Sequence, residues 1–107
     1  MSIALLRNYI DGQFVSSVSI ETLNLINPVD ERVVARAPIS TREDVEAAVA
    51  AASRAFLTWG RTTPAFRQTA LLKLADAIEA HSADIVEAQC RNTGQLRAVI
   101  ATEEVAV

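Results

Sequence analysis

The amino-acid sequence predicts an α+β fold in which four short strands are followed by three or four helices. Between residues 8 and 37, short runs of apolar residues alternate with polar ones, a period of two that is typical of strands. From Ser40 onward, apolar residues recur every three or four positions, as on one face of a helix. Pro28, Gly60 and Gly94 each end one of these runs, because proline and glycine interrupt regular backbone structure.

The predicted strands form two pairs. Asn8–Ile10 and Gln13–Val15 flank Asp11-Gly12, a dipeptide whose backbone twist suits a two-residue hairpin turn. Glu21–Asn27 and Arg32–Ala37 form the second pair, and the turn from Asn27 to Glu31 joins them. Pro28 ends the first strand of this pair, because proline has no backbone N–H to donate to a neighbouring strand.

The first predicted helix begins at Ser40 and ends at Gly60. Ser40 and Glu43 have the spacing of a capping box, in which each side chain bonds the backbone N–H of the other residue. The residues that recur at helical spacing form one apolar stripe: Val45, Ala48, Val49, Ala52, Ala55, Phe56 and Trp59. Thr63-Pro64 begins the second helix, since proline is well tolerated in the first turn. The predicted buried face of this helix holds Leu71, Leu74, Ala75 and Ile78.

Two further helical segments are expected after a break at His81-Ser82. Ser82 can cap a helix that ends at Gly94, and a last helix is expected from Thr102, because Glu103-Glu104 complement the positive end of a helix dipole. The chain ends inside this last segment, which we interpret as truncation, although a natural end in a frayed helix is the alternative. We expect the apolar stripes of the first two helices to dock on a sheet or helices that are mostly absent from these 107 residues.

Composition excludes several classes of protein. The formal charge is −3, the pI is near 5.0 and no basic run is present, which argues against a nucleic-acid partner. No apolar stretch approaches the length that spans a bilayer, so we expect no membrane partner. One cysteine cannot form an internal disulfide, and the short apolar start before Arg7 is no signal peptide, so we expect a soluble, cytoplasmic protein.

The sequence shows no active site. Three scattered glycines cannot form a phosphate-binding loop. Cys90 is the only sulfur nucleophile, but it lies near the carboxyl end of a helix, where the dipole disfavours a thiolate, so we interpret it as structural. His81 lies in the break between helices with no evident partner, and one histidine with one cysteine cannot make a structural zinc site. The carboxylates Glu43, Asp44 and Glu46 are explained by the helix dipole.

Several segments, in order and without gaps, resemble the amino-terminal part of the aldehyde dehydrogenase family. They are Tyr9–Val15, Ile26–Pro28, Ser40–Val49, Ala55–Trp59, Thr63-Pro64 with Arg67, Leu71–Ile78 and Arg91–Gln95. Within the family, the motifs T-T-P, L-L-K-L-A-D-A-I-E and C-R-N-T-G look most like aminobutyraldehyde and betaine aldehyde dehydrogenases. Two departures stand out. Glu31 occupies a turn position where the family usually has glycine, so a side chain sits where positive φ is expected, and Gln95-Leu96-Arg97 replaces a lysine-proline-leucine turn.

The resemblance implies that residues 1–107 are an incomplete amino-terminal part of an α/β, Rossmann-like NAD-binding domain, and that the catalytic domain is absent. Members of the family oxidise an aldehyde to the acid with NAD or NADP, through a cysteine nucleophile and a glutamate base. Those residues and the cofactor-binding segments are expected beyond Val107, and no catalytic role passes to Cys90. The complete protein is expected to be a homo-oligomer.

One site is implied in part by the same resemblance. Some relatives hold a monovalent cation with two backbone carbonyls and an aspartate, at positions that match Leu25, Ile26 and Asn92. Asparagine would offer a neutral carbonyl oxygen, which binds a hard cation more weakly than a carboxylate does. A turn-capping role for Asn92 is the alternative. At the level of the whole chain, the alternative to an enzyme part is a non-catalytic helical module, or relic, that pairs with a full-length relative.

Overall fold

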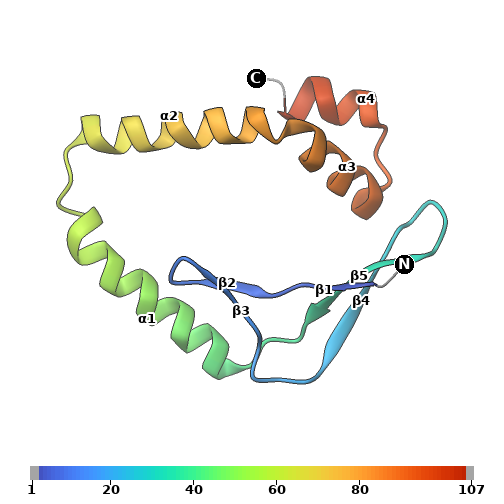
Figure 1. The fold of residues 1–107 in the computed structure, drawn as a ribbon, viewed down its shortest axis with the longest axis horizontal. Coiled ribbons are helices and arrows are strands. Elements are labelled where there is room, and N and C mark those ends of the chain that lie inside the picture. Colours follow the sequence, from blue (N-terminus) through green and yellow to red (C-terminus); the bar gives the residue numbers. More distant parts are fainter. Residues whose placement is uncertain (1–2, 106–107) are drawn as a thin grey trace. The chain divides into compact units, whose positions relative to one another are not determined.

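The computed structural model describes residues 3–105, in which strands precede helices as predicted (Figure 1). The strands are β1 (Ala4–Leu5), β2 (Asn8–Ile10), β3 (Gln13–Val15), β4 (Thr22–Ile26) and β5 (Val33–Pro38). The helices are α1 (Arg42–Trp59), α2 (Pro64–Ala80), α3 (Ser82–Thr93) and α4 (Arg97–Val99), followed by the π-helical segment η1 (Ile100–Val105). The prediction of an α+β chain with strands before helices is therefore confirmed.

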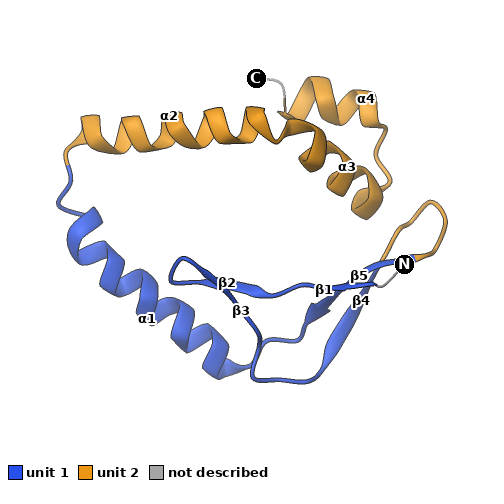
Figure 2. Ribbon diagram, in the orientation of Figure 1, with its two compact units in different colours: residues 1–25, 33–62 blue, residues 26–32, 63–107 orange. Residues whose placement is uncertain are grey.

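The chain divides into two compact units (Figure 2). The first unit comprises Met1–Leu25 and Val33–Thr62, and it contains α1 and the strands except Ile26, the last residue of β4. The second unit comprises Ile26–Arg32 and Thr63–Val107, and it contains the turn between β4 and β5 together with the remaining helices.

The prediction of four strands missed β1. This two-residue strand pairs in parallel with β5, with Ala4 opposite Ala35 and Leu5 opposite Arg36, and it completes a three-stranded sheet of order β1-β5-β4. Such a short strand carries no periodicity of its own, and its partner is about thirty residues away in the sequence. Only the fold therefore reveals it.

The hairpin of β2 and β3 is formed as predicted. Asn8 pairs with Val15, and Ile10 with Gln13, in antiparallel register. Asp11 and Gly12 have φ values of 54° and 77°, so both turn residues are left-handed, as the tightest hairpin turn requires. Tyr9 and Phe14 lie opposite each other with ring centroids 5.0 Å apart in an edge-to-face arrangement, which favours the pairing of the two strands.

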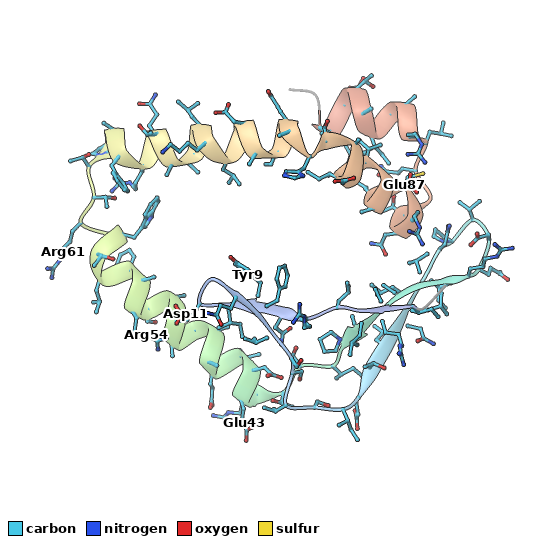
Figure 3. The ribbon with its side chains drawn as sticks, in the orientation of Figure 1. Tyr9, Asp11, Glu43, Arg54, Arg61 and Glu87 are labelled. Carbon is cyan, nitrogen blue, oxygen red and sulfur yellow. The ribbon has the colours of Figure 1, made fainter. Side chains whose placement is uncertain are left out.

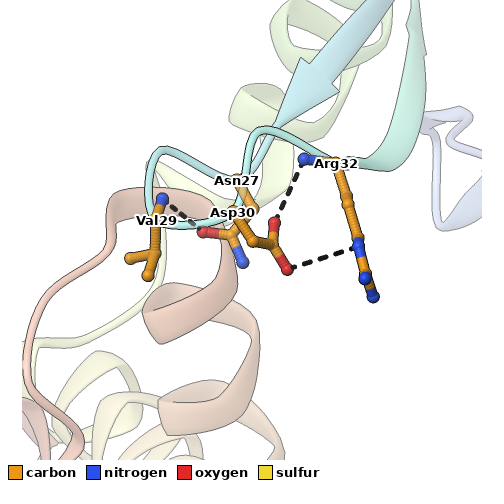
Figure 4. A network of polar contacts seen from close by, with 4 residues as sticks. All are labelled: Asn27, Val29, Asp30 and Arg32. Carbon is orange, nitrogen blue, oxygen red and sulfur yellow. Dashed lines mark hydrogen bonds and ion pairs between the residues drawn. The ribbon is translucent and has the colours of Figure 1, made fainter.

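The turn from Asn27 to Arg32 is held by its own side chains (Figure 4). Asn27 Oδ1 accepts a hydrogen bond from the Val29 amide at 2.9 Å, and Asp30 Oδ1 accepts one from the Arg32 amide at 3.1 Å. Glu31 has a φ of 58°, the left-handed region that glycine adopts most readily. The expectation that Glu31 fills a position of positive φ is confirmed.

The predicted start of α1 is wrong by one residue. The capping box is formed by Thr41 and Asp44: Thr41 Oγ1 accepts from the Asp44 amide, and Asp44 Oδ2 accepts from the Thr41 amide at 2.8 Å. Ser40 instead exchanges hydrogen bonds with the side chain of Asn8, at 3.0 and 3.1 Å. Glu43 takes no part in the cap. The helix ends at Gly60, as predicted.

Helices α2 and α3 begin and end close to the predicted positions. Thr63 Oγ1 caps α2 by accepting from the Phe66 amide at 3.2 Å, and Pro64 occupies the first turn. His81 separates the two helices, but Ser82 is the first residue of α3 and no side-chain hydrogen bond caps that end, so the predicted cap is wrong. Gly94 ends α3 in the left-handed conformation, with φ of 72°, and its amide bonds the Cys90 carbonyl at 2.9 Å.

The last helical segment begins five residues before the predicted start at Thr102. Arg97 opens α4, and η1 follows without a break. Ile100 is fully buried, so a packing contact rather than a helix-start signal fixes this segment. Glu103-Glu104 lie inside η1, not at its beginning, and Glu104 accepts hydrogen bonds from the side-chain amides of Gln89 and Gln95. The predicted end at Val107 lies outside the described residues.

None of the helices between residues 3 and 105 is both long enough and apolar enough to cross a membrane.

Candidate functional site

Helix α1 has two different faces, and only one is used inside the first unit. Asp44 and Ala51, two turns apart, are 8% and 7% exposed. On the same side of the helix, the Arg54 guanidinium lies 3.5 Å from the Asp11 carboxylate of the hairpin turn (Figure 3). Small or polar side chains thus seat α1 on β2 and β3.

The second face of α1 carries its large apolar residues and is uncovered. Val45, Val49 and Phe56 lie about 130° around the helix from Asp44 and Ala51, because successive helical residues are offset by about 100°. Val45 is 56% exposed and Phe56 is 67% exposed. We call Val45, Val49 and Phe56 the α1 stripe. Of the apolar stripe predicted from the sequence, Ala48 is half-buried and the other residues are exposed, whereas the buried Ala51 was not part of the prediction.

Asp44 is the one buried charged side chain in the described part of the chain. Its Oδ2 accepts from Ser17 Oγ at 2.5 Å and its Oδ1 accepts from the Val18 amide at 3.3 Å, in addition to the bonds with Thr41. The Ser17 hydroxyl, followed by the Thr41 amide, holds the pKa of the Asp44 carboxyl below its ordinary value. Asp44 therefore ties the segment after β3 to the first turn of α1.

The sequence interpretation missed this role, because it assigned Asp44 to the helix dipole together with Glu43 and Glu46. The only local signal was the spacing from Thr41 to Asp44, which also fits a capping box. Ser17, which makes the shortest contact, is 27 residues away and carries no spacing signal.

Helix α2 is also uncovered. Leu71 is 62% exposed, Leu74 is 55% exposed and Ile78 is 40% exposed, and no residue of α2 is buried. The face predicted to be buried is therefore not buried by residues of the second unit. We call Leu71, Leu74 and Ile78 the α2 face.

The second unit has its own small core around α3, α4 and η1. Val86 of α3 and Ile100 of η1 are its buried apolar residues. Arg97 Nη2 lies 2.5 Å from Glu87 Oε2. This bond and the charge of Glu87 raise the pKa of Arg97, with a smaller contribution from Cys90. Arg97 is thus paired with a carboxylate of the same unit.

Cys90 and His81 both lie in the second unit, and His81 has a carboxylate partner that the sequence did not suggest. Cys90 is half-buried in the last turn but one of α3, and His81 lies between α2 and α3 with Nδ1 3.8 Å from an Asp84 oxygen. Among residues 3–105, no three histidine, cysteine or carboxylate side chains are grouped so that they could hold a metal ion. The interpretation of Cys90 as a structural residue stays a prediction.

The residues of the predicted cation site lie at two element ends. Leu25 and Ile26 end β4, and Asn92 is in the last turn of α3. Ile26 and Asn92 belong to the second unit, whereas Leu25 belongs to the first. Within the second unit, Gly94 lies against the turn that follows Ile26, since a Cβ at Gly94 would be 2.9 Å from Pro28 Cγ. Asn92 is exposed.

The sequence model of the aldehyde dehydrogenase family matches residues 14–107. Malonate-semialdehyde dehydrogenase 1 of Geobacillus kaustophilus is 39% identical over 90 residues, which cover 84% of this chain and 18% of that protein.

Solved structures agree with the sequence comparison. An aldehyde dehydrogenase of Bartonella henselae superposes on 97% of this chain and 22% of its own, with a TM-score of 0.92 and 25% identity. PnpE, solved in complex with nicotinamide adenine dinucleotide, superposes on 94% of this chain and 21% of its own, with a TM-score of 0.89 and 37% identity. The chain spans about a fifth of the length of each of these three proteins.

Proposed function

Because this chain belongs to the aldehyde dehydrogenase family, we propose that it forms the amino-terminal part of an enzyme that oxidises an aldehyde to a carboxylic acid with NAD or NADP. The proposed place of residues 1–107 is the edge of the NAD-binding domain. The observation that carries the proposal is the family match over residues 14–107, with a backbone that superposes on relatives about five times longer. A homo-oligomer in the cytoplasm is part of the same proposal, and the lone cysteine suits that compartment.

The two uncovered faces support a role as part of a larger fold. Each large apolar side chain left in water forfeits about 1.5–3 kcal/mol of burial free energy. The α1 stripe and the α2 face together leave six such side chains between 40% and 67% exposed. A domain whose net stability is about 5–15 kcal/mol can hardly forgo several burials of this kind. We propose that further chain of the enzyme covers both faces.

We propose that these 107 residues alone are catalytically inactive. The chemistry of such an enzyme needs a thiolate to attack the aldehyde carbon and a base to activate the water that releases the acid. The bound nicotinamide cofactor would accept the hydride. The family resemblance places both groups beyond Val107, and the Arg97 guanidinium is paired with Glu87.

An assay of the purified chain tests this proposal. Aldehydes are supplied with NAD or NADP, and reduced nicotinamide is followed by absorbance. The expected result is no turnover above the rate of the buffer, for both the parent chain and Cys90→Ala. Turnover by the parent chain that disappears in Cys90→Ala would show that Cys90 is the nucleophile and would refute inactivity.

The narrower likeness to aminobutyraldehyde and betaine aldehyde dehydrogenases stays a prediction from the motifs. The Geobacillus protein is named for malonate semialdehyde, and a rat protein that is 39% identical over 84 residues is named for methylmalonate and malonate semialdehydes. A panel of amino-aldehydes and semialdehydes, supplied to a complete enzyme that carries this segment, separates the two substrate classes by kcat/KM.

We also propose a weak monovalent-cation site formed by the backbone carbonyls of Leu25 and Ile26 and the side-chain carbonyl of Asn92. The family resemblance at these positions supports it, since a hard cation binds backbone and amide carbonyl oxygens. The test is the thermal midpoint of the chain in potassium, sodium or choline chloride at one ionic strength. We expect Asn92→Asp, which supplies a carboxylate, to increase the difference between potassium and choline, and Asn92→Ala to remove it. Equal midpoints in all three salts for all three proteins would refute the site.

A second candidate function follows from the same exposure: a non-catalytic module that pairs with a full-length relative. It requires a chain that is folded on its own yet presents apolar helix faces to a partner. Light scattering and amide hydrogen exchange on the isolated chain distinguish the two. A monodisperse chain with strong amide protection in α1 and α2 favours the module, whereas aggregation or weak protection there favours the enzyme part.

A further inference from the structure

We draw no further inference here: the strongest candidate, the open groove between α3 and the last helical turns that Glu79, Ser82, Val86 and Arg97 line, is mostly apolar, and nothing in the structure shows what covers it.

Discussion

Replacing Gly94 by alanine would strain the second unit in two ways at once. The φ of Gly94 is 72°, a conformation that L-residues other than glycine rarely adopt. A Cβ at this position would also lie 2.9 Å from Pro28 Cγ and 3.1 Å from Val29 Cγ2, both shorter than ordinary van der Waals contacts. The turn between β4 and β5 and the end of α3 would have to separate to make room.

The size of the effect follows from three contributions. A left-handed backbone costs an L-residue about 1–2 kcal/mol. Overpacking by a methyl group costs about 1–3 kcal/mol. Alanine also lowers the conformational entropy of the unfolded chain, which offsets about 0.4–1 kcal/mol of this loss. We therefore expect Gly94→Ala to lower the free energy of unfolding of the second unit by roughly 3 kcal/mol.

Gly12 provides a matched control in the hairpin turn. Its φ is 77°, yet a Cβ there would meet no heavy atom within 4 Å. Gly12→Ala therefore suffers the backbone strain alone, and we expect it to cost about 1 kcal/mol. The difference between the two variants isolates the contact of Gly94 with the turn.

Urea unfolding of a complete enzyme that carries this segment measures both losses, and amide exchange assigns each loss to its unit. Pro28→Ala in the Gly94→Ala background provides an internal check. It removes the atom at 2.9 Å, leaves the Cβ of residue 28 at 3.9 Å, and is expected to restore part of the lost stability. Equal losses for the two glycine variants, with no recovery on changing Pro28, would refute the close contact.

Three further predictions follow from the first unit and the turn. Thr41→Ala should destabilise the chain by about 1 kcal/mol, because Thr41 caps α1, and Ser40→Ala should destabilise it by much less. If urea unfolding showed the larger loss for Ser40→Ala, Ser40 and not Thr41 would be the capping residue. Because the folded pKa of Asp44 is lowered, its contribution to stability is complete above the unfolded pKa of about 3.9 and is lost as pH falls through the folded pKa. Thermal midpoints measured from pH 7 downward should therefore fall less steeply in Asp44→Asn than in the parent, and parallel curves would contradict this. Glu31→Gly should stabilise the chain by up to about 1 kcal/mol, because glycine adopts the left-handed backbone without strain. Asp30→Gly should destabilise it, because it removes the hydrogen bond to the Arg32 amide. A loss of stability in Glu31→Gly would contradict the claim that Glu31 is strained.

The features predicted correctly depend on neighbouring residues. Asp11-Gly12 defines its hairpin because two residues that tolerate left-handed backbone are adjacent. Thr63-Pro64 and Gly94 mark helix ends through local backbone preferences. The positive φ at Glu31 could be predicted because the family pattern has glycine at that position.

The features missed depend on residues far apart in the sequence. The segment S-T-R-E-D offers two capping boxes, and the choice of Thr41 with Asp44 is supported by Ser17, which no local pattern connects to either residue. The last segment starts at Arg97 because Ile100 is buried and because Gln89 and Gln95 bind Glu104, whereas its acidic pair had suggested a later start.

The two faces of α1 show why a helical period alone does not identify a buried surface. The predicted stripe left out Asp44 and Ala51, which are the buried residues of α1, and it included Ala52 and Ala55, which are exposed. The burial of Asp44 depends on Ser17, which is 27 residues away and lies outside any helical period. In α2 the predicted buried face is exposed within the second unit, and Leu72, outside that face, is exposed to a similar extent.

A chimera tests most directly whether the rest of an aldehyde dehydrogenase covers the exposed faces. In it, residues 14–107 replace the matching segment of the Geobacillus kaustophilus relative. We expect the chimera to oxidise malonate semialdehyde with formation of reduced nicotinamide. Leu74→Asp in the α2 face should lower the yield of active enzyme at least about tenfold, because burying a charge there opposes assembly. Lys73→Asp places the same carboxylate one residue earlier, about 100° around the helix, and should leave the yield of active enzyme nearly unchanged. An active chimera that is indifferent to Leu74→Asp would contradict the proposed covering of this face.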